Sequence, residues 1–129
     1  MVLADTSVWI DFFRGERNGQ VELLEKLIDS GRGLVMCGIV LTEILVGARS
    51  DHQVSEMMHL FGSLTLLPMD EAVYVSAAEL YRIARKSGRT VRRVPDCLIA
   101  ACAIAHSASL HHRDRDFDTL ASVSKLKIV

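Results

Sequence analysis

The chain has 129 residues, of which 50% are hydrophobic, 5% aromatic and 24% charged. This length suits one domain spanning residues 1–129, and the hydrophobic fraction excludes a disordered chain or a low-complexity linker. Fifteen lysines and arginines oppose 16 aspartates and glutamates, and the resulting net charge of −1 argues weakly against a simple basic nucleic-acid binder.

Short apolar segments alternate with segments whose hydrophobic residues have helical spacing. In chain order we expect a strand at 2–4, helices at 8–14 and 20–30, a strand at 34–37, helices at 39–48 and 52–62, a strand at 64–67, helices at 70–86 and 95–105, a strand around 110, a helix at 117–123 and a strand at 126–129. Thr6 or Ser7 is the expected cap of the first helix. This alternation predicts an α/β fold in which helices cover both faces of a parallel sheet.

Several carboxylates stand beside apolar segments or directly after a predicted strand. Asp5 closes the first strand, Glu43 lies in the apolar segment 38–47, and Asp96 opens an apolar helix. Asp114 and Asp116 follow the fourth strand. Ligands of an open parallel sheet bind beyond the carboxyl ends of the strands, so we expect these acids to converge. Converging carboxylates repel one another unless a cation such as Mg²⁺ or Mn²⁺ binds, and such a site suits phosphodiester hydrolysis by an activated water.

Most of these acids also have a purely structural explanation. The helix dipole stabilises a carboxylate in a first turn by up to about 1 kcal/mol, which could account for Asp96 and Asp116, while Asp5 could start a turn. Glu43 is harder to explain, because burying an unpaired carboxylate costs several kcal/mol.

Four segments that carry these acids resemble the PIN-domain ribonucleases, and more closely the VapC toxins of toxin–antitoxin pairs. The segments are Asp5–Asp11, Thr42–Gly47, Pro95–Ala103 and Asp114–Phe117, in the family's order along the whole chain. The resemblance implies a PIN-like three-layer α/β/α fold with a central parallel sheet of about five strands. It also implies an Mg²⁺- or Mn²⁺-dependent endoribonuclease that acts on tRNA or rRNA, forms a homodimer and is inhibited by a VapB-like antitoxin.

The resemblance assigns roles to particular residues. The catalytic and metal-binding acids that it carries over are Asp5, Glu43, Asp96 and Asp114, with Asp116 as a candidate fifth ligand, direct or through water. Thr6 matches a hydroxyl residue that supports the family's site. Where the family often has Thr or Asn two residues before the fourth acid, this chain has His112, which could replace that hydrogen bond, contact substrate or do neither.

Basic residues gather on both sides of the acids. Six of them, Arg82, Arg85, Lys86, Arg89, Arg92 and Arg93, precede Asp96, and Arg113 and Arg115 flank Asp114. They form either a solvated helix end with a loop or a path that guides RNA phosphates, and the proximity of Arg92 and Arg93 to Asp96 favours the path. If a metal neutralises four acids, 12 of the 16 acids remain against 15 basic residues and the rest of the chain carries +3. The near-neutral total therefore does not exclude nucleic acid.

Trp9, Phe12 and Phe13 share one side of the first predicted helix. Core packing is the default explanation for them. The resemblance offers another, a hydrophobic groove that receives the C-terminal segment of the antitoxin.

Other classes of protein fit less well. The segment Met1–Asp5 lacks the basic region that begins a signal peptide. The chain also has no run of about 18 uncharged apolar residues, so we expect a cytoplasmic protein without membrane spans. The three cysteines lack disulfide or zinc spacing and are expected to be buried and reduced. A degenerate PIN domain that binds RNA or protein without cleaving is an alternative, which retention of all four acids disfavours. A phosphoryl-accepting receiver domain needs an Asp after its third strand and a Lys after its last, which this chain lacks.

Overall fold

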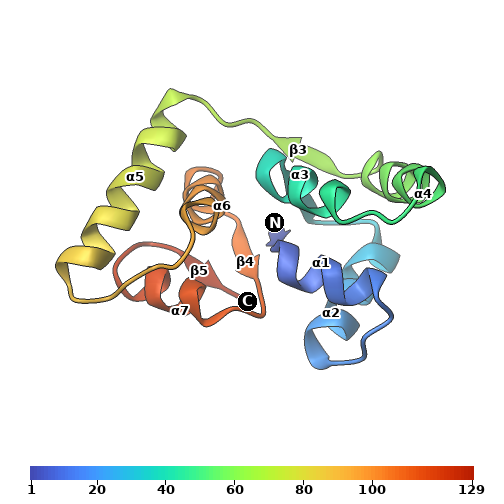
Figure 1. Ribbon diagram of the computed structural model, residues 1–129, viewed down its shortest axis with the longest axis horizontal. Helices are drawn as coiled ribbons and strands as arrows, with labels where there is room; N and C mark the ends of the chain where they lie inside the picture. Colours follow the sequence, from blue (N-terminus) through green and yellow to red (C-terminus); the bar gives the residue numbers. More distant parts are fainter.

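The computed structural model describes residues 1–129, and a parallel sheet flanked by helices runs through its centre (Figure 1). In chain order the elements are β1 (Val2–Ala4), α1 (Thr6–Phe13), α2 (Gly19–Ser30), β2 (Leu34–Cys37), α3 (Gly38–Val46), α4 (Asp51–Phe61), β3 (Thr65–Leu67), α5 (Glu71–Lys86), α6 (Val94–Ala105), β4 (Ser109–His111), α7 (Arg115–Ser122) and β5 (Lys127–Ile128). The strand order is β3-β2-β1-β4-β5, and all neighbouring strands are parallel. The predicted α/β fold with a five-stranded parallel sheet is confirmed.

The strand order reverses beside the central strand β1. Val2 of β1 pairs with Leu34 of β2 on one side and with Ser109 of β4 on the other. The chain builds β1, β2 and β3 outward and then crosses back through α5 and α6 to form β4. The connections that leave β1 and β4 therefore diverge, and the carboxyl ends of these two strands are where folds of this class bind their ligands.

The core packs on both sides of this sheet. Leu3 and Leu110 in the central strands are fully buried. Helix α6 is buried over most of its surface because it packs along α5, which lies at the left edge of Figure 1, and also contacts α7. Its alanines allow this close packing, and the three cysteines of the chain are free and buried.

The helix starts differ from the sequence prediction by one or two residues, and two of the differences have a clear cause. Helix α1 begins at Thr6 rather than Val8, because the cap is Asp5, whose carboxylate accepts the backbone N–H of Ser7. Helix α6 begins at Val94, which places Pro95 inside the first turn. Backbone N–H groups there have no partner within the helix, so the missing N–H of proline costs no hydrogen bond. No helix of the structure combines the length and the apolar character needed to cross a bilayer.

Candidate active site

Three carboxylates meet at the carboxyl edge of the sheet. Asp96, in the first turn of α6, and Asp114 and Asp116, at the start of α7, each offer one oxygen, and these oxygens lie within 4.8 Å of one another. Asp96 and Asp116 are only 3% and 5% exposed. Asp116, which the sequence offered only as a candidate fifth ligand, is thus a member of the closest group of acids.

Asp96 has an unsatisfied oxygen in this group. Its Oδ2 is buried and has no hydrogen-bond partner. Burial, and secondarily the charge of Asp5, raises the pKa of Asp96 to about 7. A buried carboxylate without a partner is unfavourable, and a bound cation would remove that cost. The all-oxygen donor set therefore fits a hard divalent cation.

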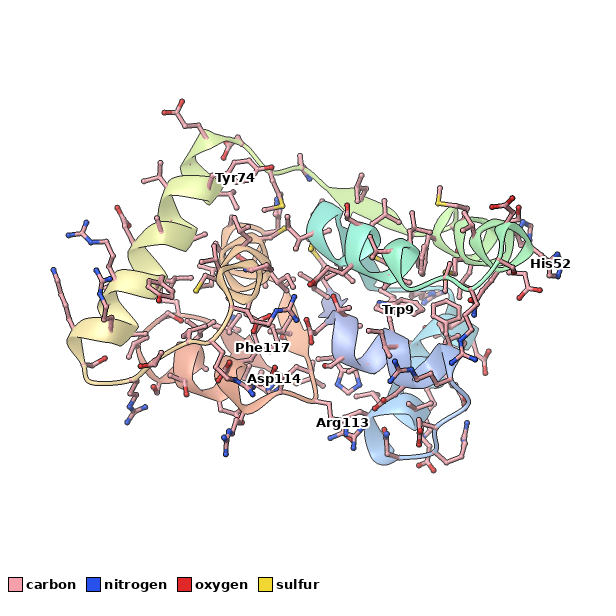
Figure 2. All side chains as sticks on the ribbon, viewed as in Figure 1. Trp9, His52, Tyr74, Arg113, Asp114 and Phe117 are labelled. Carbon is pink, nitrogen blue, oxygen red and sulfur yellow. The ribbon has the colours of Figure 1, made fainter.

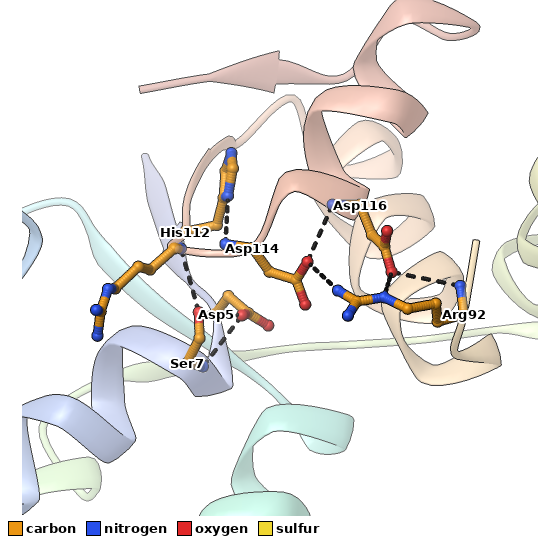
Figure 3. Close-up of polar contacts among 7 residues, drawn as sticks. Asp5, Ser7, Arg92, His112, Asp114 and Asp116 are labelled. Carbon is orange, nitrogen blue, oxygen red and sulfur yellow. Dashed lines mark hydrogen bonds and ion pairs between the residues drawn. The ribbon is translucent and has the colours of Figure 1, made fainter. Parts of the chain in front are cut away.

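Asp5 lies beside this group and is held by its neighbour Ser7. One carboxylate oxygen, Oδ2, accepts the Ser7 hydroxyl at 2.6 Å and the Ser7 backbone N–H at 3.1 Å (Figure 3). Burial raises the pKa of Asp5, and the negative charge of Glu43 adds to the effect. Asp5 is thus coupled to Asp96 by its charge, although it stands outside the group of three.

Glu43 is held from two sides on helix α3. The Thr6 hydroxyl donates to its Oε1 at 2.7 Å, and Arg93 forms an ion pair with its Oε2. Glu43 also lies outside the group of three. Thr6, which directly follows Asp5 in the chain, therefore positions Glu43.

His112 is hydrogen-bonded toward Asp114. Its Nδ1 accepts the backbone N–H of Asp114 at 3.0 Å (Figure 3), and its Nε2 lies 3.2 Å from Oδ1 of Asp118. Because Nδ1 accepts, the ring proton is on Nε2 and is donated to Asp118. The neighbouring His111 contacts a different part of the fold, the backbone carbonyl of Gln20 at 2.7 Å. Of the alternatives for His112, the geometry corresponds to the replacement hydrogen bond.

The basic residues expected to meet RNA are mostly occupied by acids of the protein. Arg92 pairs with Asp116 through Nε and with Asp114 through a terminal nitrogen, both at 2.9 Å. Arg93 is bound to Glu43, as noted above. Arg113 turns away from the pocket and pairs with Asp11 of α1. Arg115, the fourth predicted RNA contact, is exposed and forms no ion pair.

The aromatic cluster belongs mainly to the core. Trp9 is completely buried and packs against Phe12, Phe13 and Phe61, with ring centroids 5.1–6.0 Å apart. The expectation that Trp9 lines a docking groove is therefore wrong. A pocket of about 430 Å³ does open beside α1, lined by Ile10, Phe13, Arg14, Glu16, Ile44, Gly47, Arg49, Gln53 and Met57. Phe13 is the one predicted groove residue that lines it.

Sequence reasoning missed two residues that contact the site acids or their neighbours: Ser7, which bonds Asp5, and Asp11, which pairs with Arg113. Asp11 is only 8% exposed although it lies in the apolar helix α1. An acid among apolar residues is the same signal that identified Glu43. Applied to residues 6–13, it would have identified Asp11 as well.

This chain is similar to known proteins in sequence and, separately, to solved structures in fold. A family model described as the PIN domain matches residues 2–123. VapC ribonuclease Mb1587 of Mycobacterium bovis and ribonuclease VapC11 of Mycobacterium tuberculosis are each 40% identical over 129 residues, covering 98% of this chain and 96% of the relative. A solved toxin–antitoxin complex from Klebsiella pneumoniae contains a chain of the same fold, with 20% identity, a TM-score of 0.74 and coverage of 99% of this chain and 100% of that chain.

Proposed function

The chain belongs to the PIN domain family and, within it, to the VapC ribonucleases, and from this membership we propose that it is a toxin that hydrolyses RNA phosphodiester bonds with a divalent cation, Mg²⁺ or Mn²⁺. The observation that carries the proposal is the group of Asp96, Asp114 and Asp116, with the unpartnered Oδ2 of Asp96 inside it. We treat residues 1–129 as one PIN domain.

Each acid has a role in this proposal. Asp96, Asp114 and Asp116 would hold the cation, and Asp5 and Glu43 would add negative charge beside it. When bound, the cation supplies Lewis-acid chemistry: it stabilises charge on the phosphate and favours ionisation of water. Burial raises the pKa of Asp5, which suits this carboxylate to accept a proton from the attacking water.

RNA would approach through the basic residues around the pocket. Arg92 pairs with Asp114 and Asp116, and Arg93 pairs with Glu43. If a cation neutralised these acids, both guanidinium groups would be free to bind phosphate. Arg115 is already exposed beside Asp114. The substrate classes that fit the family are tRNA and rRNA, which would place the activity in the cytoplasm.

The pocket beside α1 supports a protein partner. Its apolar residues Ile10, Phe13, Ile44 and Met57 could anchor a short apolar segment, while Arg14 and Arg49 could pair with acids of that segment. A VapB-like antitoxin is the proposed occupant, and the Klebsiella pneumoniae structure is described as a toxin–antitoxin complex. A homodimer that binds antitoxin is the assembly that we propose.

The test compares the wild type with Asp96→Asn and Asp114→Asn on purified total RNA. We expect cleavage by the wild type with Mg²⁺ and none by either variant or in EDTA. Cleavage that persists in both variants, or in EDTA, would contradict the mechanism. RNA binding by the wild type without cleavage in Mg²⁺ or Mn²⁺ would instead favour a non-catalytic binding module.

A further inference from the structure

An ion pair between an exposed arginine and a buried aspartate joins α1 to the loop between β4 and α7. Arg113, in this loop, reaches toward α1 and α2 (Figure 2) and pairs with Oδ2 of Asp11. The same oxygen accepts the side-chain amide of Asn18 at 3.2 Å. The side chain of Asp11 is only 12% exposed, so its charge depends on these two donors.

A second link joins the same loop to Asp5. The backbone N–H of Arg113 donates to the Ser7 hydroxyl at 3.2 Å, and that hydroxyl donates to Oδ2 of Asp5 at 2.6 Å (Figure 3). A single oxygen atom therefore contacts both the acid after β1 and the loop after β4. The loop is fixed to α1 at two points, by its backbone through Ser7 and by its side chain through Asp11.

These links act on the residue that follows. Asp114 comes directly after Arg113, three residues beyond the end of β4. Its carboxylate caps α7 by accepting the backbone N–H of Asp116 at 3.0 Å. Any shift of the loop would move Asp114 and the start of α7 together, away from Asp96, which is on a different helix. Cation binding depends on such distances within fractions of an ångström.

We propose that Asp11, Arg113 and Ser7 are positioning residues that set Asp114 and Asp116 against Asp96. In this role Arg113 acts inside the protein and does not contact RNA. The inference rests on the proposed function, because it concerns the geometry of the proposed cation site.

The test measures Mn²⁺ affinity of the full-length protein by calorimetry, together with KM and kcat for RNA cleavage. We expect Asp11→Asn and Arg113→Gln each to weaken Mn²⁺ binding about tenfold or more, as for other residues that orient metal ligands. The double variant should be no worse than the poorer single variant, because both changes break the same pair. KM for RNA should stay unchanged. Ser7→Ala should weaken Mn²⁺ binding, and Ser7→Thr, which keeps the hydroxyl, should restore it.

The matched control is Glu25→Gln on the neighbouring helix α2. It breaks the exposed ion pair of Glu25 with Arg17 and should leave the Mn²⁺ affinity unchanged. If Arg113→Gln raises KM for RNA while Arg113→Gln and Asp11→Asn both bind Mn²⁺ like the wild type, the inference is overturned and Arg113 is an RNA contact. Asp96→Asn separates the two proposals. If Asp96→Asn still binds Mn²⁺, the proposed function is contradicted. If Asp96→Asn loses Mn²⁺ binding while Asp11→Asn keeps the wild-type affinity, only the positioning role is contradicted.

Discussion

Asp96 combines a structural cost with a proposed functional role. Its buried Oδ2 lacks a partner, and burial raises its pKa to about 7. The folded protein therefore binds this proton more tightly than the unfolded chain, whose aspartates titrate near 3.8. The metal-free protein should lose stability as the pH rises from about 4 through 7, because folding then forces a charge into a poorly solvated position.

The variant Asp96→Asn tests this cost. We expect it to raise the free energy of unfolding at pH 8 in EDTA and to have much less effect near pH 4.5. At roughly 1.4 kcal/mol per pKa unit, the increase at pH 8 is at most about 4 kcal/mol. Urea denaturation at both pH values measures the difference. Asp29→Asn, an exposed acid on α2, is the control and should change stability little at either pH. Equal effects of Asp96→Asn at the two pH values would show that this carboxyl does not titrate as described.

Single residues also mark what sequence reasoning could and could not provide. The acids were identifiable because a carboxylate beside apolar residues is unusual, and this signal does not depend on distant contacts. The partners of Arg113 and Arg92 were not identifiable, since Asp11 and Asp116 lie 102 and 24 positions away along the chain. Trp9 has the same helical spacing whether it packs in the core or lines a groove, so only the fold decides between them.

At the scale of elements, periodicity identified each helix and strand but not how the strands are ordered. Strand order depends on the crossover through α5 and α6, which local patterns do not encode. The predicted start of α1 was wrong because the role of Asp5 as its cap was not recognised. Asp5 was assigned to the metal site, yet it also caps α1 through Ser7, so one carboxylate serves two purposes.

The segment between α5 and α6 makes a prediction at this scale. Val91 is 2% exposed and anchors the segment, while Arg92 and Arg93 extend from it to the acids. Because Arg92 occupies two carboxylates that the cation needs and Arg93 occupies Glu43 beside them, we expect Arg92→Gln with Arg93→Gln to bind Mn²⁺ severalfold more tightly. The same double variant should bind RNA more weakly and with a flatter salt dependence, since it loses two phosphate contacts.

Two measurements check these opposite effects. Calorimetry gives the Mn²⁺ affinity, and filter binding at several salt concentrations gives the RNA affinity, in an Asp5→Asn background so that RNA stays uncut. Lys26→Gln with Arg32→Gln, exposed charges in and just after α2 that form no ion pair, is the control for net charge. An unchanged salt dependence in Arg92→Gln with Arg93→Gln would remove both arginines from the RNA path.

Over the whole molecule, positive and negative charges nearly cancel in number, yet carboxylates concentrate at one edge of the sheet. The chain carries a net charge of −1, but Asp96, Asp114 and Asp116 lie together at the carboxyl edge of the sheet. Arg92 and Arg93 balance part of this charge, and Oδ2 of Asp96 has no partner among the side chains and backbone around it. Stability of the whole domain should therefore depend on a bound cation, because the cation binds the folded acids and not the dispersed acids of the unfolded chain.

Thermal unfolding with and without Mg²⁺ tests this dependence. A ligand at 100 times its Kd stabilises a fold by about 2.7 kcal/mol, and for a domain of this size each kcal/mol raises Tm by roughly 3–5 °C. We expect Mg²⁺ to raise the Tm of the wild type by several degrees at pH 8 and by less at pH 5, where a proton on Asp96 competes with the cation. Asp96→Asn and Asp114→Asn should lose most of this rise, and NaCl at the same ionic strength should not reproduce it. A rise of equal size in the variants, or in NaCl alone, would mean that Mg²⁺ acts by general screening and not at the three carboxylates.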